Sequence, residues 1–349
     1  MAGRTGPGSL RRRTGLVLAW LGAFMLGTGI MLRTYVYDHV AVLPVNVYAV
    51  TTLHATGATY FDPSVLRTRT GLNVTATSTL RGDALAATGD TGVYDTFLAV
   101  RATDGTPIKY VQTRAALDRH TGLLVDCCGA NVGGDSSVRE SGLSFKFPFF
   151  ARKTSYPMFD TDVLRTVPAT YAGQTSIDGM LVYRYVQVLP TSQIGQRQVP
   201  PSIMGMRPWP ALITVRSLEA TTMTFWADPV TGAPVKVEEN TRQFLRTANG
   251  RHTRLAFAAD FKQNPADVAA AVDRHRSQSS QLTLVHGPLP LGSVIFGAAL
   301  LVIGALLVYG SRSKRGSRAR QAGVAAGSAA GVGAEVARIR AGDQQARNT

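Results

Sequence analysis

The stretch DRHTGLLVD, Asp118–Asp126, has a near copy further along the chain, DPVTGAPVK, Asp228–Lys236. Each copy places an aspartate, two variable residues and Thr-Gly before an apolar run. This order suits a tight turn whose glycine accepts a positive φ and enters a second strand through a bulge. The flanking segments, IKYVQTRAAL, TMTFWA and PVKVEE, show a rough alternation of apolar and polar residues. The repeated phrase therefore predicts two β-hairpins and not a catalytic motif.

The positive charge of the chain is concentrated at its two ends. The net charge is +15 and the pI is about 10.3, values that invite a nucleic-acid interpretation. However, residues 1–33 carry five arginines and no acid, and residues 312–349 carry eight basic and two acidic residues. The middle of the chain, residues 34–311, is nearly balanced, with 24 basic and 20 acidic residues. We therefore expect no nucleic-acid partner, and the basic ends indicate membrane topology instead.

Each basic end adjoins an uncharged apolar run. TGLVLAWLGAFMLGTGIML, Thr14–Leu32, has 19 residues and would span roughly 28 Å as a helix. A cleaved signal peptide is the alternative, because Arg11–Arg13 would serve as its basic region, but no clear A-x-A cleavage site follows. The second run, Leu289–Gly310, ends against a cluster of basic residues. The positions of the basic residues predict that both termini are cytoplasmic.

This pattern predicts a two-pass plasma-membrane protein with a main domain on the extracytoplasmic side. We expect a membrane-anchored, mainly antiparallel β (α+β) ectodomain between an N-terminal and a C-terminal transmembrane helix. The expected parts are a basic cytoplasmic tail at 1–13, a signal-anchor helix at 14–33, a β-rich domain at 34–286, a second transmembrane helix at 287–310, and a basic Ala/Gly-rich cytoplasmic tail at 311–349 that is disordered.

Within the domain, the sequence predicts strands with a break at Pro44, at least four consecutive strands before the first Thr-Gly turn, and a Gly/Ser-rich loop at 127–141. TSQIGQRQVPPSIMGMRPWPALI, residues 191–213, is interpreted as a Pro-rich excursion. Asn264-Pro265 is typical of an N-cap followed by the first residue of a helix, which then leads into the second apolar run.

Catalytic and metal-binding patterns are missing from the sequence. The six histidines have no metal-ligand spacing, and no G-x-S-x-G or phosphate-binding loop is present, so we expect neither an enzyme nor a cofactor or metal. Asp160 and Asp162 could share acid/base work or bind a cation, although a solvated loop explains them more simply. The adjacent Cys127 and Cys128 cannot make a long-range cross-link; they form either a redox pair, an intermolecular bridge, or buried or idle thiols.

The most aromatic segment is GLSFKFPFFARKTSYPMFD, whose rings could line an apolar cavity, lie at the membrane interface or fill an ordinary core. We take them as candidate lipid-binding residues, and Phe147 and Phe149 are expected to share one face of an extended chain. The six candidates are Phe145, Phe147, Phe149, Phe150, Tyr156 and Phe159.

Taken in order between two terminal apolar runs, DRHTGLLVDC, GLSFKFPF, KTSYPMFD and DGMLVYRY resemble the actinobacterial envelope family described as PorA-like, over roughly residues 15–310. The family name implies a channel, and the resemblance also implies work on envelope lipoglycans such as lipomannan. No active-site residue is implied.

We therefore expect a cell-envelope protein of actinobacterial type whose β-rich domain binds or hands on a membrane lipid or lipoglycan, with other envelope proteins as further partners. The alternatives are a PorA-like, porin-like channel and a non-catalytic structural anchor. A transmembrane β-barrel is disfavoured, because such barrels need an apolar outer face and no helical anchors.

Overall fold

The computed structural model describes residues 7–207 and 211–310. The chain divides into two compact units, one formed by residues up to Val36 together with those from Val285 onward, the other by Tyr37–Leu284. The tail at 311–349 that was expected to be disordered lies outside the described residues.

The first unit is helical. Helix α1, Pro7–Met31, continues through a π-helical turn at Leu32–Val36, and a second helix covers residues 288–310. Large apolar side chains point outward from both helices, for example Trp20 and Phe24 on the first and Phe296 and Leu306 on the second, each more than 60% exposed. Exposure of such apolar surfaces to water is unfavourable. Both helices are long and apolar enough to cross a membrane, so they are candidate membrane spans.

The two helices pack against each other through glycines spaced seven residues apart. An added Cβ at Gly22 would lie 2.7 Å from the carbonyl oxygen of Gly297, and one at Gly304 would lie 2.6 Å from that of Gly15. Gly29 approaches the carbonyl oxygen of Pro290 in the same way. The numbering runs in opposite directions along the two helices, so they are antiparallel. Only glycine allows backbones to approach this closely.

The second unit is built on one twelve-stranded sheet in which neighbouring strands pair antiparallel, with the order β5-β4-β3-β2-β1-β12-β11-β10-β9-β8-β7 and with β6 paired to β4. The strands are β1 Tyr48–Asp62, β2 Arg67–Gly82, β3 Thr91–Ala102, β4 Pro107–Asp118, β5 Leu124–Val125, β6 Asn131–Val132, β7 Tyr156–Asp160, β8 Arg165–Ile177, β9 Met180–Val199, β10 Ile213–Ala227, β11 Pro234–Thr247 and β12 Thr253–Gln263. Short helices α2, Tyr37–Val40, and η2, Pro201–Met204, and most of the long α3, Pro265–His286, complete the unit.

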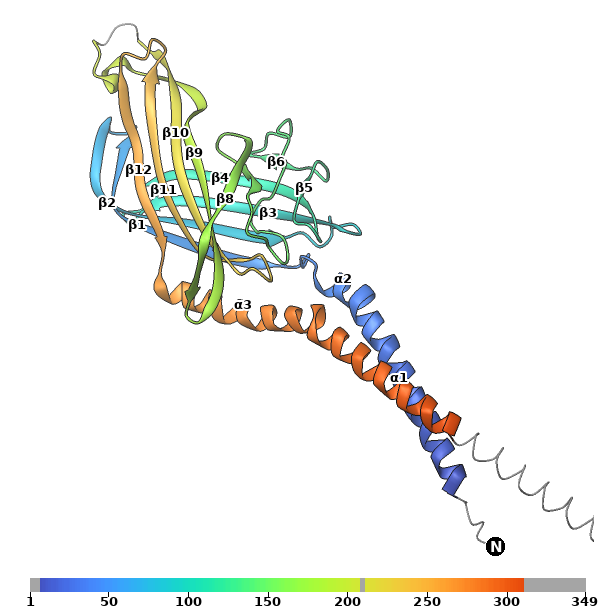
Figure 1. Ribbon diagram of the computed structural model, residues 1–349. Coiled ribbons are helices and arrows are strands. Elements are labelled where there is room, and N and C mark those ends of the chain that lie inside the picture. Colours follow the sequence, from blue (N-terminus) through green and yellow to red (C-terminus); the bar gives the residue numbers. More distant parts are fainter. Residues whose placement is uncertain (1–6, 208–210, 311–349) are drawn as a thin grey trace, which may run out of the picture. The chain divides into compact units, whose positions relative to one another are not determined.

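The sheet is strongly curled (Figure 1). Its two edge strands are bridged at one point by the loop after β6. Leu124 next to one edge donates its N–H to Gly142 O at 2.8 Å. On the opposite edge, the N–H of Leu143 donates to the carbonyl oxygen of Pro157, and the carbonyl oxygen of Leu143 accepts a hydrogen bond from the N–H of Phe159, both at 2.8 Å. The loop after β6 therefore joins β5 to β7, which covers edges that would otherwise expose unpaired backbone groups.

The two Thr-Gly phrases form the same turn, as the repeat predicted. Each aspartate accepts hydrogen bonds from two backbone N–H groups and from the threonine hydroxyl that follow it. Gly122 and Gly232 have φ values of +75° and +73°, which glycine adopts without steric cost. The first turn joins β4 to β5 and the second joins β10 to β11. Both hairpins are confirmed.

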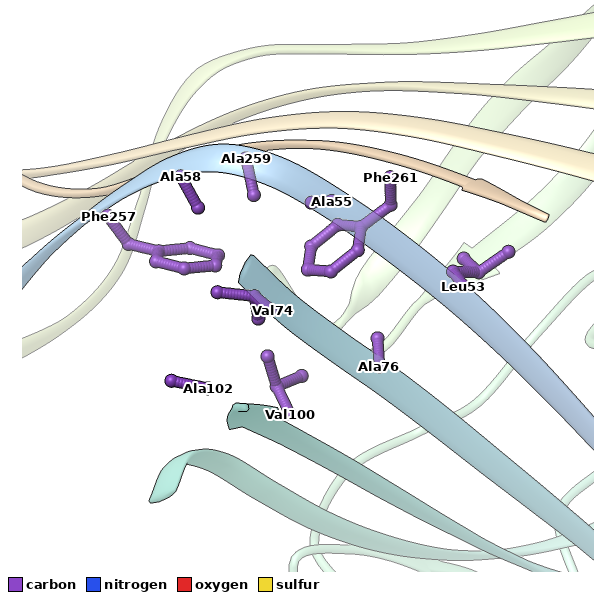
Figure 2. Close-up of a cluster of buried hydrophobic side chains, with 10 residues drawn as sticks. All are labelled: Leu53, Ala55, Ala58, Val74, Ala76, Val100, Ala102, Phe257, Ala259 and Phe261. Atoms are coloured by element: carbon purple, nitrogen blue, oxygen red, sulfur yellow. The ribbon is translucent and has the colours of Figure 1, made fainter. Parts of the chain in front are cut away.

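Ten buried residues form the main core on the inner face of the sheet, where strands β1, β2, β3 and β12 meet (Figure 2). The rings of Phe257 and Phe261 from β12 lie against small side chains such as Ala76 and Val74 from β2. Large rings opposite alanines and valines fill the interior because both sizes alternate across the layer.

Two predictions about local structure were wrong. Residues 191–199 are not a Pro-rich excursion but the second half of β9, which tolerates Pro190 because the pairing with β10 is interrupted by a bulge there. Residues 37–40 are helical instead of extended, since adding residues to a formed helix is far easier than starting one. By contrast, the helix start at Asn264 is confirmed, because its side-chain oxygen accepts the N–H of Ala266 at 3.1 Å.

Candidate functional site on the outer face of the sheet

Two exposed rings stack on the outer face of strands β3 and β4. Phe97 and Tyr110 are 45% and 46% exposed, and their ring centroids lie 6.0 Å apart with the planes 13° from parallel. The guanidinium of Arg101 sits 5.1 Å from the centre of the Tyr110 ring. We call these three residues the outer platform. Exposed aromatic rings that lie together offer a flat apolar surface that another molecule can cover.

Small polar side chains surround the outer platform. Phe97 lies in a cross-strand row with Val50, Thr79 and Gln112. The row that contains Tyr110 continues through Ala99 to two threonines, Thr77 on β2 and Thr52 on β1. Hydroxyl and amide groups donate and accept hydrogen bonds. The surface therefore combines ring faces with hydrogen-bonding groups.

A polar hollow lies on the same face, where β1 meets β12 and α3 begins. It is lined by His54, Thr56, Asp260, Lys262, Gln263 and Asn264. One cross-strand row connects the hollow to the outer platform, running from Lys262 through His54 and Thr75 to Arg101. Strands β1 and β4 are three spacings apart, roughly 14 Å at about 4.8 Å each. The two features thus form one continuous polar and aromatic surface.

The outer face also bears exposed charges along its long strands, among them Arg216, Arg242, Asp260 and Lys262. A transmembrane barrel needs an apolar band at such positions, because a charge facing lipid is costly. The surface of this sheet suits water, and the two apolar helices are the candidate membrane spans.

The aromatic side chains of residues 145–159, the aromatic segment, contact several different neighbours and do not form one common wall. Phe147 is fully buried and stacks on Tyr185, with ring centroids 4.2 Å apart, and Tyr156 meets Phe147 edge-on at 5.8 Å. Phe145 contacts Tyr94 edge-on at 5.3 Å in a different cluster.

The remaining candidates go elsewhere. Phe149 lies beneath the ammonium of Lys146 at 3.4 Å, Phe150 faces Tyr37 with centroids 6.0 Å apart, and Phe159 is 9% exposed. The segment around Phe147 and Phe149 is not a strand, so the expectation that they share one face of an extended chain was wrong. Their role in binding a lipid stays a prediction.

Ionisable groups cluster on the inner face, around Lys109. Asp162 forms an ion pair with Lys109, and although burial alone would lower the pKa of this lysine, Asp162 and Glu219 raise it. Burial raises the pKa of Glu239 to about 7 and also that of Glu219. Asp160 instead caps the turn after β7, accepting N–H groups from residues 162 and 163. No group of three or more His, Cys, Asp or Glu residues within the described ranges could hold a metal ion.

A second ionisable group is buried beside the second hairpin. Lys146 is 8% exposed, and burial lowers its pKa to about 7, although the nearby Asp228 acts in the opposite direction. Asp228, itself 1% exposed, accepts a hydrogen bond from the Ser279 hydroxyl of α3 at 3.3 Å. This copy of the turn therefore also helps hold α3.

Sequence reasoning missed the outer platform. GVYDTFLAV and IKYVQTRAAL were both interpreted as strands, and alternation places Phe97 on the face opposite Tyr94. Which face of a strand meets solvent depends on the curl of the whole sheet. The candidate binding residues were therefore predicted in the segment with the most aromatic rings.

Fold and surface together define a mainly antiparallel β protein with two candidate membrane-spanning helices. The family model described as Porin PorA matches residues 14–306, and the chain belongs to this family. A protein named Porin PorA from Corynebacterium amycolatum is 29% identical over 97 residues, which cover 25% of each chain. The chain thus matches only about a quarter of the length of that relative.

Proposed function

We propose that this protein is a non-catalytic envelope protein that binds the glycan part of a membrane lipoglycan on the outer face of its β domain. Membership of the Porin PorA family supports work in the cell envelope. The single observation that carries the binding proposal is the exposed stack of Phe97 and Tyr110 among hydrogen-bonding side chains.

Sugars suit this surface for a physical reason. A sugar ring has apolar C–H faces that pack on aromatic rings, and its hydroxyl groups need donors and acceptors nearby. The platform supplies the rings, and the polar hollow supplies charged and amide groups. The rings of the aromatic segment are largely occupied with one another and with neighbouring side chains, which favours the outer face over the interior as the binding surface.

The test measures binding of purified lipomannan to the full-length chain in detergent micelles. The double variant Phe97→Ser/Tyr110→Ser is expected to bind at least tenfold more weakly, a loss of about 1.4 kcal/mol. The matched control is Leu181→Ser/Val188→Ser, which removes two apolar side chains of similar exposure, 49% and 55%, from β9. Free mannose oligosaccharides should compete if the glycan is recognised.

Failure of the wild-type chain to bind would refute the proposal, as would equal weakening by the control variant. Competition by a lipid that carries no sugar, but not by free oligosaccharide, would mean that the acyl chains are recognised and would favour the aromatic segment as the binding site.

The second candidate is a channel, which the family name Porin PorA favours. Conductance of the full-length chain across a planar bilayer tests it. Stable unitary currents from the wild-type chain would assign a channel, and would require several copies, because the close glycine contacts leave no room for a pore between the two helices of one chain.

A further inference from the structure

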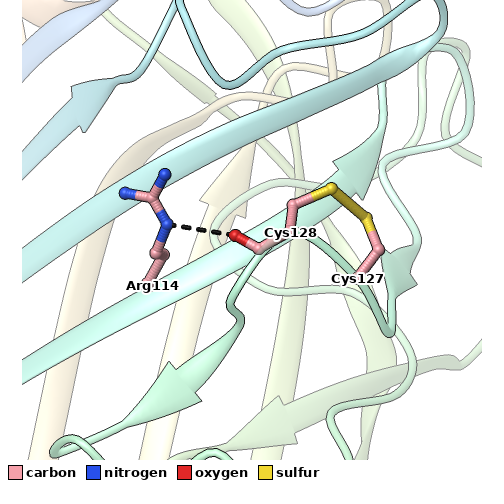
Figure 3. The surroundings of a disulfide bond; sticks show 3 residues. All are labelled: Arg114, Cys127 and Cys128. Carbon is pink, nitrogen blue, oxygen red and sulfur yellow. Dashed lines mark hydrogen bonds between the residues drawn. A yellow bond between two sulfur atoms is a disulfide. The ribbon is translucent and has the colours of Figure 1, made fainter.

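Cys127 and Cys128 form a disulfide with each other, so the interpretation of buried or idle thiols was wrong (Figure 3). Cys127 is half-buried and Cys128 is exposed. No other cysteine exists in the chain. The bond is therefore the chain's single site of disulfide chemistry, and one of its two residues is exposed to solvent.

The disulfide lies within a tight turn that joins β5 to β6. Ala130 donates its N–H to the carbonyl oxygen of Cys127 at 3.0 Å, and the two residues between them, Cys128 and Gly129, have φ values of +60° and +76°. Positive φ at both central positions defines a type I′ turn. Glycine and asparagine favour this conformation, whereas cysteine rarely adopts it. The covalent link between Cys127 and Cys128 restrains Cys128 in this conformation.

Arg114 of β4 attaches this turn to the sheet. Its Nε donates to the carbonyl oxygen of Cys128 at 3.2 Å, as Figure 3 shows. Its two terminal nitrogens are held by Asp95, at 2.9 and 3.0 Å, and by Asp83, at 2.7 Å. Because two carboxylates fix the guanidinium, the bond to Cys128 depends on the conformation of the turn. The chain beyond the turn continues to Leu143, which bridges the sheet edges.

We propose that the Cys127–Cys128 disulfide is a thiol-exchange site for a dithiol reductant, and that its reduction opens the turn. A thiolate of the dithiol attacks Sγ of the exposed Cys128, forming a mixed disulfide while the Sγ–Sγ bond breaks and Cys127 leaves as a thiolate. The second thiolate of the reductant then attacks its own mixed-disulfide sulfur, which releases Cys128. Two electrons pass to the cysteine pair, the dithiol becomes a disulfide, and both cysteine thiolates take protons from water.

Reduction removes the link that holds Cys128 at positive φ. The residue can then adopt ordinary extended or helical backbone angles, which moves its carbonyl oxygen away from Arg114 and breaks the turn hydrogen bond of Ala130. This inference is independent of the proposed glycan binding, which involves none of these residues.

The test treats the full-length chain in detergent micelles with dithiothreitol under native conditions, followed by iodoacetamide and peptide mass spectrometry. We expect no alkylation before reduction and alkylation of both cysteines after it. Hydrogen–deuterium exchange at the Ala130 amide should become at least tenfold faster on reduction. The double variant Cys127→Ser/Cys128→Ser should show the faster exchange without reductant and no response to dithiothreitol.

Three results would overturn the proposal. Alkylation without reductant would mean that the native cysteines are free thiols. Alkylation only after denaturation would mean that the bond is inaccessible. Unchanged exchange at Ala130 after complete reduction would mean that the disulfide does not restrain the turn. If the double variant does not fold, the comparison of oxidised and reduced wild-type chain still decides the question.

Discussion

Replacing each turn aspartate by asparagine should have unequal effects, although Asp118 and Asp228 stand in the same sequence phrase. Asp118 uses a single carboxylate oxygen, Oδ1, for all three of its side-chain hydrogen bonds, which it accepts from the N–H of His120 and from the N–H and hydroxyl of Thr121. Asparagine also has one side-chain oxygen and can keep these bonds. Asp118→Asn should therefore lower the free energy of unfolding by less than about 1 kcal/mol, the loss of charge assistance.

Asp228 uses both oxygens. Its Oδ1 accepts from the Val230 N–H and the Ser279 hydroxyl, while its Oδ2 accepts from the N–H and hydroxyl of Thr231, at distances from 2.6 to 3.3 Å. An asparagine NH₂ at either position faces donors, and the side chain is 1% exposed, so water cannot replace the missing acceptor. Asp228→Asn should therefore cost about 2–4 kcal/mol.

The assay is urea unfolding of both full-length variants in the same detergent, followed by tryptophan fluorescence, with Trp226 at the end of β10 as a reporter near the second turn. Equal destabilisation of the two variants, or a larger effect at Asp118, would refute the argument from oxygen usage. Should Asp228→Asn fail to fold while Asp118→Asn folds normally, the predicted order still holds.

Two further predictions concern buried charge and helix packing. Because burial lowers the pKa of Lys146 from its ordinary 10.5 to about 7, the folded chain binds fewer protons than the unfolded chain between these values. The contribution of Lys146 to the free energy of unfolding therefore rises with pH from about 7 to 10.5, by up to about 1.4 kcal/mol per pH unit. Urea unfolding at several pH values should show that this rise is weaker in Lys146→Met and unchanged in the control variant of an exposed lysine, Lys153→Met. Equal pH profiles of the two variants would contradict the prediction. Gly22→Leu should overpack the contact between the two apolar helices, which lowers the free energy of unfolding by roughly 1–3 kcal/mol and lowers the melting temperature. Gly27→Leu is the control, because an added Cβ there meets nothing within 4 Å and the melting temperature should not fall. Equal melting temperatures would show that the glycine contacts do not stabilise the helix pair.

Local chemistry explains what the sequence predicted well. The hydrogen bonds that define each turn join an aspartate to residues no more than five positions away, so the turn conformation is decided locally, although Asp228 also accepts a bond from Ser279 of α3. The helix start at Asn264-Pro265 is equally local. The two apolar runs are recognisable because length and hydropathy alone determine whether a helix can span a membrane.

The errors arose where distant pairing decides the outcome. Pro190 is accepted inside a strand because a bulge against β10 removes the need for its N–H, and this bulge cannot be inferred from residues 191–199. Phe147 and Phe149 were placed on one face by assuming an extended chain, yet backbone pairing of residues 147–151 with the second turn bends the segment. The outer platform was missed because the curl of the sheet determines which side of β3 meets solvent.

Pairing of β1 with β12 has a consequence for the order of folding. It aligns Leu53 with Gln263, which are 210 positions apart, and closing so large a loop costs about 5 kcal/mol of chain entropy before any contact repays it. Strand pairs of this kind form slowly when the chain ends diffuse freely. If the two apolar helices associate first through their glycines, the ends of the intervening chain are already tethered, and most of that search is over before the sheet begins to form. We therefore expect refolding without the helices to be slower, with β1–β12 pairing as its late step.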